Sequence, residues 1–202
     1  MPADTGARDV VLRLRAADVA TVTVRDADGR PVEGATVVAA DVDETMRDDV
    51  LPELLRRDDV GPSATTDAGG VARLGGLDAA RGYLLGVRPP ATRPELVPHV
   101  DARWRPGATA VALAPGLEVA GMVVGAAGTP VAGVDVTCVD ALGVARRQTT
   151  RGDGAFRFRG LPPGEVEVVA RWFDPAAPPA TRASRGSRSA RAGDAGLRLV
   201  LD

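Results

Sequence analysis

Apolar and polar residues alternate along many short segments of this chain. Ala35, Val37 and Ala39 fall on one side of such a segment, and Phe156 and Phe158 share a side in another. An alternation with a period of two is typical of β-strands with one buried face, because successive side chains point to opposite faces of a sheet. Glycine and proline separate the alternating segments, which indicates tight turns between short strands. The pattern therefore predicts an all-β chain.

The alternating pattern and its turns occur twice. Residues 26–42 return, with substitutions, as residues 125–141, which is an offset of 99 residues. Residues 65–77 align without gaps with residues 149–161 at the shorter offset of 84 residues, so the first copy carries 15 additional residues between the two segments. Offsets of this size are typical of small domains. We therefore expect two antiparallel β-sandwiches in tandem, with a short helical insert in the first.

The repeat places the first predicted domain at residues 1–115 and the second at residues 116–202. A third alternating segment occurs three times, at residues 10–14, 109–113 and 196–201. Two sandwiches need only two such closing strands, so the first of the three is supernumerary. It either extends a sheet of the first domain or closes a domain lost from the N-terminus. Unpaired backbone groups at a sheet edge recruit further strands, so this segment also predicts self-association through sheet edges.

The additional residues of the first copy lie in an insert at residues 41–63, which contains the pattern of a short helix. Its leucines fall on one helical face, while carboxylates and arginines cover the rest. One interpretation is that the leucine face seals the open end of the first sandwich and the charges stay in water. The other is a partner-binding surface formed by Leu51, Leu54, Leu55, Asp58 and Asp59.

A second long connection is expected at residues 173–194, which are rich in Pro, Ser, Gly and Arg. Arginine recurs there at every third position, and in a polyproline II segment, whose period is three residues, these side chains would line one face. The segment is either a solvated loop or an anion-binding strip for a polyanionic glycan, a nucleic-acid backbone or the acidic insert of another copy. The residues of this strip are Arg182, Arg185, Arg188 and Arg191.

Both tryptophans, Trp104 and Trp172, follow an Ala-Arg pair at the end of a connection. An exposed indole at such a place would stack on a sugar ring, so polysaccharide binding is one prediction. The other is that the indoles fill small cores, because only 3% of the residues in this chain are aromatic and large aromatic side chains are well buried on average.

The composition excludes several classes of function. Lysine is absent, His99 is the only histidine and Tyr83 is the only tyrosine, so we expect no Schiff base, no lysine–asparagine cross-link and no multi-histidine metal site. The serines lie in Pro- and Gly-rich connections, where His99 cannot readily serve as their base. Cys138, the single cysteine, excludes an internal disulfide and is expected to be a core residue. We therefore expect no catalytic residues, no metal and no cofactor.

Charge and hydropathy give further expectations about partners. The net charge of −2 provides no general attraction to nucleic acid, and with so few aromatic residues no readout of base sequence is expected. No apolar run approaches the roughly 18 residues of a membrane helix, so no membrane insertion is expected. Residues 1–11 lack the pattern of a signal peptide, which predicts a cytoplasmic chain if Met1 is the native start.

The turn and core residues that both copies share form a recognisable set. They are Gly29, Pro31, Gly34, Val37, Thr66, Gly70 and Leu77 in the first copy, and Gly128, Pro130, Gly133, Val136, Thr150, Gly154 and Leu161 in the second. This set resembles the carboxypeptidase regulatory-like domain, a seven-stranded, transthyretin-like (prealbumin-like) sandwich of immunoglobulin-like architecture. The resemblance implies a non-catalytic accessory or adhesive module, extracellular or on a bacterial cell surface.

We therefore predict a structural, adhesive or protein-binding subunit of a bacterial assembly or surface protein. Its partner is expected to be a protein or a further copy of the chain, bound through sheet edges and the inserts. The alternatives are a carbohydrate-binding module that uses Trp104 or Trp172, and accessory regulatory domains of a larger enzyme.

Overall fold

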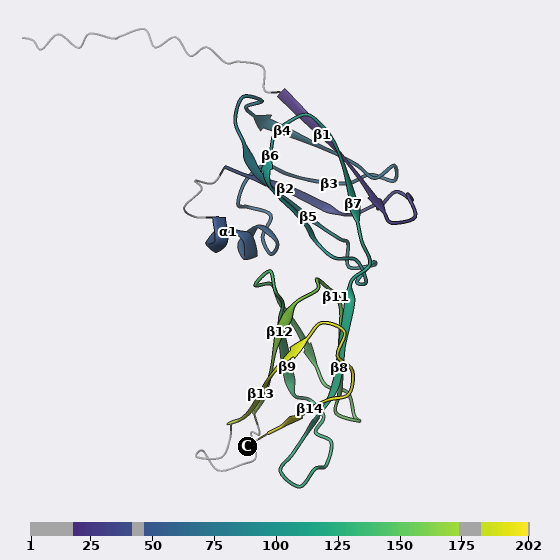
Figure 1. Ribbon diagram of the computed structural model, residues 1–202, viewed down its shortest axis with the longest axis vertical. Helices are drawn as coiled ribbons and strands as arrows, with labels where there is room; N and C mark the ends of the chain where they lie inside the picture. Colours follow the sequence, from purple (N-terminus) through teal and green to yellow (C-terminus); the bar gives the residue numbers. More distant parts are fainter. Residues whose placement is uncertain (1–17, 42–46, 174–182, 202) are drawn as a thin grey trace, which may run out of the picture.

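The computed structural model describes residues 18–41, 47–173 and 183–201. The predicted supernumerary strand at residues 10–14 lies outside these ranges. The described residues form two sandwich units, which Figure 1 shows one after the other along the long axis of the molecule. The prediction of an all-β chain built of two sandwiches is confirmed.

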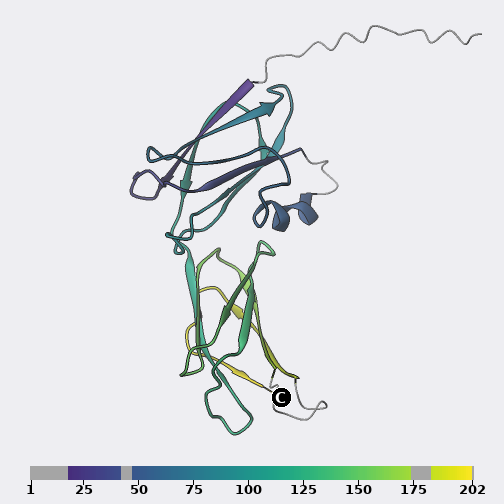
Figure 2. The ribbon, with the colours of Figure 1, turned by 180° about the vertical axis from the view of Figure 1, so that it is seen from behind.

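The first unit pairs a three-stranded sheet, in the order β4-β1-β7, with a four-stranded sheet, in the order β3-β2-β5-β6. Figure 2 shows both sheets from behind. The helix α1 lies between β2 and β3 in the sequence. The elements are β1 (Asp18–Asp26), β2 (Thr36–Ala40), α1 (Arg47–Leu54), β3 (Ser63–Thr65), β4 (Val71–Leu77), β5 (Tyr83–Arg88), β6 (His99–Trp104) and β7 (Ala108–Leu113).

The second unit repeats this arrangement strand for strand. Its sheets have the orders β11-β8-β14 and β10-β9-β12-β13, which are the orders of the first unit advanced by seven strands. The elements are β8 (Leu117–Val124), β9 (Asp135–Val139), β10 (Ala145–Thr149), β11 (Ala155–Leu161), β12 (Glu165–Phe173), β13 (Ala183–Arg191) and β14 (Leu197–Val200). Each unit is therefore a seven-stranded sandwich.

One strand pair in each sandwich differs from the antiparallel arrangement that was expected. The closing strand β7 runs parallel to β1, and β14 runs parallel to β8. All other strand pairs of the described residues are antiparallel. The first and last strands of a unit thus lie side by side and point the same way, so the chain enters a unit at one end and leaves it at the other.

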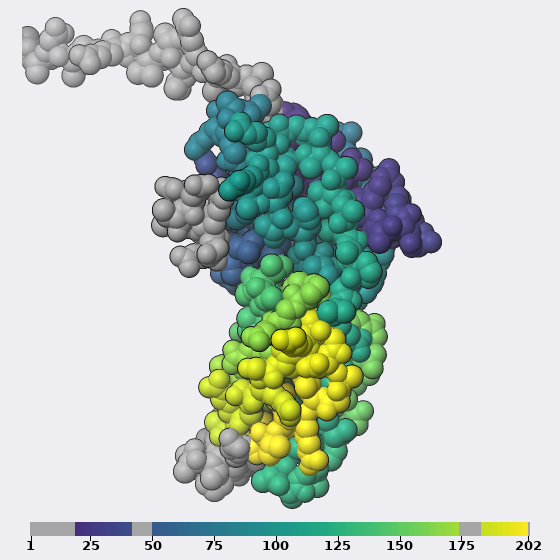
Figure 3. All heavy atoms as spheres, viewed as in Figure 1, coloured from purple at the N-terminus to yellow at the C-terminus, as the bar shows by residue number. Residues whose placement is uncertain are grey.

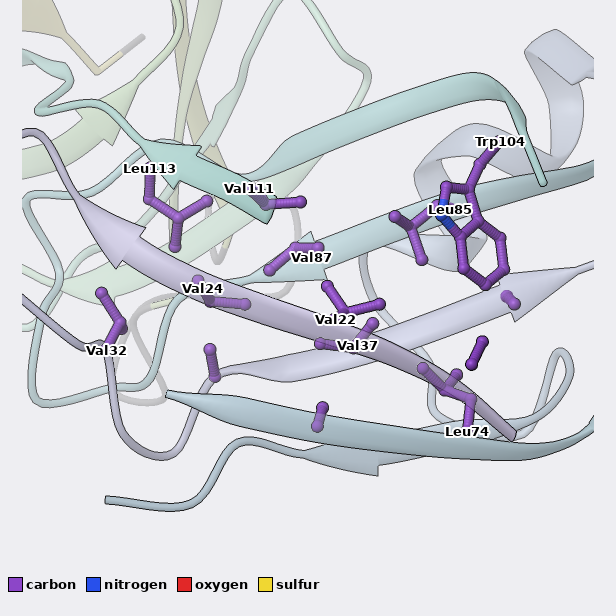
Figure 4. Packing of buried hydrophobic residues seen from close by; sticks show 14 of the residues in the cluster. Val22, Val24, Val32, Val37, Leu74, Leu85, Val87, Trp104, Val111 and Leu113 are labelled. Atoms are coloured by element: carbon purple, nitrogen blue, oxygen red, sulfur yellow. The ribbon is translucent and has the colours of Figure 1, made fainter. Parts of the chain in front are cut away.

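Each unit has its own core, formed by the inward positions of the alternating strands. In the first unit, Val22 and Val24 of β1 pack with Val37 of β2 and Leu85 of β5 (Figure 4). In the second unit, the fully buried Cys138 lies among valines and phenylalanines of both sheets. Burial raises the pKa of its thiol to about 11, which agrees with the expected role of a core residue.

A buried threonine in the connection between β3 and β4 binds the turn that precedes β2 in the first unit. The Thr66 hydroxyl accepts a hydrogen bond from the Ala35 N–H at 2.8 Å and donates one to the Val32 carbonyl at 2.7 Å. Close by, the carbonyl of Gly70 accepts from the Val24 N–H at 2.7 Å. A Cβ added at Gly70 would lie 2.4 Å from the Val24 oxygen, so only glycine allows the approach.

The same bonds recur in the second unit at the offsets of the sequence repeat. The Thr150 hydroxyl accepts from the Val134 N–H and donates to the Val131 carbonyl, with both bonds 2.9 Å long. The Gly154 carbonyl accepts from the Val123 N–H, also at 2.9 Å. The shared threonine and glycine therefore hold the connection between the third and fourth strands of each unit against its first strand and the connection that follows that strand.

Replacing Thr66 or Thr150 by valine is expected to destabilise the unit that carries it by about 1–3 kcal/mol, because a buried backbone N–H loses its acceptor while the side-chain volume stays the same. Serine at the same position keeps the hydroxyl and serves as the control. Urea denaturation of the four variants measures the difference. A valine variant as stable as its serine counterpart would contradict the proposed role of the hydroxyl.

Candidate functional surfaces

Helix α1 packs against the outer face of the four-stranded sheet of the first unit. Leu54, which is fully buried, contacts the outward side chains Val38 of β2 and Leu84 of β5. Gly86 makes room for it, since an added Cβ would lie 2.8 Å from Leu54. Leu55 is also buried. The helix therefore covers a face of the sheet. The interpretation that its leucines seal the open end of the sandwich is wrong.

The predicted partner-binding surface on the insert is wrong in its apolar part. Leu54 and Leu55 are internal, and Leu51 is half-buried, because the sheet beneath them offers valine, alanine and leucine where an outer face usually carries polar residues. Asp58 and Asp59 are exposed and pair with arginines of the same unit, Asp58 with Arg88 of β5. The exposed carboxylates remain a predicted contact for a partner.

Trp104 is a core residue, so the predicted carbohydrate contact at this position is wrong. Its side chain is 3% exposed and packs edge-on against Tyr83, with ring centroids 6.3 Å apart. Its indole N–H donates to the Thr109 hydroxyl at 2.8 Å, which satisfies the one polar group of the ring.

Trp172 lies differently, near the end of β12. It is half-buried against the second core and lines a groove of about 460 Å³. Its neighbour Phe173 is 62% exposed. Polar side chains of Asp135, Arg171 and Arg185 complete the lining. An exposed ring beside hydrogen-bonding groups is compatible with a sugar ligand, and carbohydrate binding remains a prediction for Trp172.

The predicted loop at residues 173–194 is largely a strand. Residues 183–191 form β13, which pairs with β12 along its whole length. The inward positions of β13 are Ser184, Gly186, Arg188 and Ala190, and at Gly186 an added Cβ would lie 2.4 Å from the Val200 oxygen of β14. Because three small residues and an arginine occupy the inward positions, the strand shows no apolar alternation in the sequence.

The arginines of this segment do not share one face. Arg182 lies outside the described residues. Arg185 and Arg191 are on the outer face of the sheet, whereas Arg188 stands opposite the inward Val168. A strand with a period of two separates side chains that a period of three would align. Arg185 and Arg188 still line a polar cleft with Arg198, so anion binding at this edge remains a prediction.

A loop of the first unit, residues 93–97, forms the junction between the units. Arg93 fixes this loop by donating to Asp26 at 3.2 Å and to Glu95 at 2.5 Å. The bond from Arg93 lowers the pKa of Glu95. Burial alone would raise the pKa of Asp26, but bonds from the backbone N–H of Arg30 and from Arg93 outweigh it and lower that pKa.

The junction loop binds the connection between β7 and β8. The Val97 N–H donates to the Ala114 carbonyl at 2.9 Å, and the Gly116 N–H donates to the Glu95 carbonyl at 2.7 Å. Gly160 of β11 packs into the same place. A Cβ added there would lie 2.5 Å from the Pro94 oxygen and 2.6 Å from the Leu96 oxygen, so the second unit approaches the first through bare backbone.

A second contact joins the units away from the connection. Pro52 of α1 lies beside Gly143 in the turn between β9 and β10, and a Cβ added at Gly143 would be 2.9 Å from the proline ring. Figure 3 shows the atoms of the two units in contact across this region. Two separate contacts resist bending about the short connection more than one contact would.

A groove of about 670 Å³ lies beside the junction along β11. It is lined by Pro94 of the first unit and by arginines of the second, including Arg151, Arg157 and Arg159. Glu118 accepts a hydrogen bond from Arg159 at 3.1 Å and forms an ion pair with Arg157 at 3.3 Å. Because both units contribute to it, the shape of this groove depends on the junction.

The described ranges contain no group of three or more His, Cys, Asp or Glu side chains that could hold a metal ion. Within the same ranges, no helix is long and apolar enough to cross a membrane.

Several solved structures are similar to this chain. The Bacillus anthracis TIE protein is 16% identical with a TM-score of 0.31, and the match covers 92% of this chain and 33% of that chain. A streptococcal ancillary pilin is 17% identical with a TM-score of 0.37, covering 93% and 63%. The minor pilin of Streptococcus agalactiae is 14% identical with a TM-score of 0.41, covering 90% and 94%. This chain therefore spans a third of the first protein and less than two thirds of the second.

The sequence has no match among curated proteins. Residues 118–192 match the family model of the carboxypeptidase regulatory-like domain. These residues cover the strands from β8 to β13, and the first unit has the same sheet orders and the same threonine and glycine contacts. The second unit is therefore similar to the carboxypeptidase regulatory-like domain over most of its length, and the first unit repeats the fold of the second strand for strand.

Proposed function

We propose that the chain is a non-catalytic structural module of a larger assembly, in which two sandwiches form a spacer of fixed geometry. The observation that carries this proposal is the junction. Gly116 and Gly160 let backbone meet backbone between the units, and Pro52 on α1 adds a second contact. A chain that needed two independent domains would be served by a longer connection than the three residues between β7 and β8.

The use of the repeated residues supports a structural role. Thr66, Thr150, Gly70 and Gly154 are committed to bonds within the sandwiches. Specific binding then falls to surfaces that differ between the units, since function resides in sites built onto a fold. These surfaces are the exposed carboxylates of the insert on the first unit and the arginine-lined groove and cleft of the second.

The partner that these surfaces favour is a protein, or a further copy of the chain. The first unit exposes the carboxylates of Asp58 and Asp59, each paired with an arginine, and the second unit exposes arginines around Arg151 and Arg198. Such an arrangement favours contacts of the first unit of one copy with the second unit of another. The edge strands of the sheets offer backbone groups for the same purpose.

Carbohydrate binding is a second candidate, and one observation favours it. The exposed ring of Phe173 stands beside Trp172 in a groove with charged side chains. A role as accessory domains of a larger enzyme is the remaining alternative.

The junction is tested by alanine at two equivalent glycines. Gly76 and Gly160 both have a positive φ, of 79° and 65°, so alanine costs each about 1–2 kcal/mol of backbone strain. Only at Gly160 does the new Cβ meet the other unit, whereas at Gly76 there is nothing within 4 Å. We expect small-angle scattering to report a changed or broadened maximum dimension for Gly160→Ala and an unchanged one for Gly76→Ala. Identical scattering from the two variants would contradict a fixed junction.

The two tryptophans are separated by single-tryptophan variants. We expect the Trp172→Phe variant, which retains Trp104, to resist acrylamide quenching, and the Trp104→Phe variant, which retains Trp172, to be quenched. Titration of the Trp104→Phe variant with polysaccharides then reports ligand binding in the groove through the fluorescence of Trp172. Carbohydrate binding at Trp172 is refuted if polysaccharide leaves both its emission and its quenching unchanged.

A further inference from the structure

We propose that the chain carries tensile load along its length and that the parallel pairs of first and last strands in each unit are the elements that resist it. This inference rests on the proposed structural function and gives it a mechanical form. It follows from the direction of the strands at which the chain enters and leaves each sandwich.

The geometry of the first unit places its terminal strands in shear. β1 and β7 are neighbours and parallel, with the register running from Thr21 opposite Ala108 to Asp26 opposite Leu113. A pull on the start of β1 and a pull on the end of β7 therefore act along the strands in opposite directions. The hydrogen bonds between the two strands are then loaded together, whereas a pull across the strands would break them one after another.

The side chains of this strand pair add to the resistance. Val22 and Val24 of β1 and Val111 and Leu113 of β7 are at most 4% exposed and belong to one core. Sliding β7 by one residue would turn its inward side chains to the outer face. The strand pair therefore cannot slip by a small step without pulling apolar side chains out of the core.

The second unit repeats this arrangement and continues the path of the load. β14 is parallel to β8, with Leu197 opposite Gly121 and Val200 opposite Val124. The bond from the Leu201 N–H to the Val124 carbonyl, at 2.9 Å, extends the pair. Figures 1 and 2 show β7 leading into β8 along the long axis of the molecule, so tension passes directly from one parallel pair to the next.

The composition leaves this task to non-covalent contacts. The chain has one cysteine and no lysine, so neither an internal disulfide nor a lysine-derived cross-link can hold a sandwich closed under tension. Hydrogen bonds that are loaded together, and the packing of core side chains beside them, are then the means by which such a unit withstands a pull on its ends.

The test compares two directions of pulling on the full chain. Handles are attached by thiol chemistry to cysteines introduced at exposed positions. The Val19→Cys/Leu117→Cys variant is pulled along the strands, and the Val19→Cys/Ala108→Cys variant is pulled across them. Cys138 does not interfere, because it is buried and its thiol pKa is raised to about 11. Urea denaturation of both variants confirms that each is folded.

We expect the rupture force in single-molecule pulling to be several-fold higher for the Val19/Leu117 pair than for the Val19/Ala108 pair. Equal rupture forces in the two directions would overturn the proposal. This result is separate from the scattering comparison at Gly160, which reports the orientation of the units and not their strength. A weak unit with a fixed junction would thus refute the load-bearing role and leave the spacer intact.

Discussion

One buried threonine hydroxyl in each sandwich joins two connections between strands, the one that leads into the second strand and the one that leaves the third. The hydroxyls of Thr66 and Thr150 each accept a hydrogen bond from a backbone N–H on one side of the turn before the second strand. Each also donates a hydrogen bond to a backbone carbonyl on the other side of that turn. A buried N–H without an acceptor is costly, so the turn cannot move away from this hydroxyl. With the turn in place, β2 and β9 are set in register, and the two sheets of each unit face one another across a filled core.

Much of the fold could be predicted because the repeat marks the turns and the alternation marks the buried faces. β13 could not be predicted, since a strand whose inward residues include Gly186 and Ala190 has no apolar pattern. The position of α1 was missed for a related reason. The leucines of the insert signal burial, but only the structure reveals that the outer face formed by Val38 and Leu84 is where they pack.

The candidate sites were predicted less well than the fold. Trp104 and Trp172 both follow an Ala-Arg pair, yet one fills a core and the other lines a groove. They lie on strands that are not equivalent, since β6 is at the edge of its sheet and β12 is inside its sheet. The junction between the two units is not marked by any pattern in the local sequence. Gly160 could be recognised as a turn glycine from its counterpart Gly76, but its contact with residues 93–97 depends on how two units meet. Contacts between repeats are absent from the pattern of a single repeat.

The account divides the chain into shared residues that build the sandwiches and unshared surfaces that are left for partners. Its central claim is that the threonine hydroxyls hold the connections between strands together in both units, and amide hydrogen exchange in the native protein tests this most directly. The account predicts that the N–H groups of Ala35 and Val134, which donate to these hydroxyls, are among the slowest to exchange in their units. Exchange as fast as that of the exposed turn residue Gly29 would contradict it.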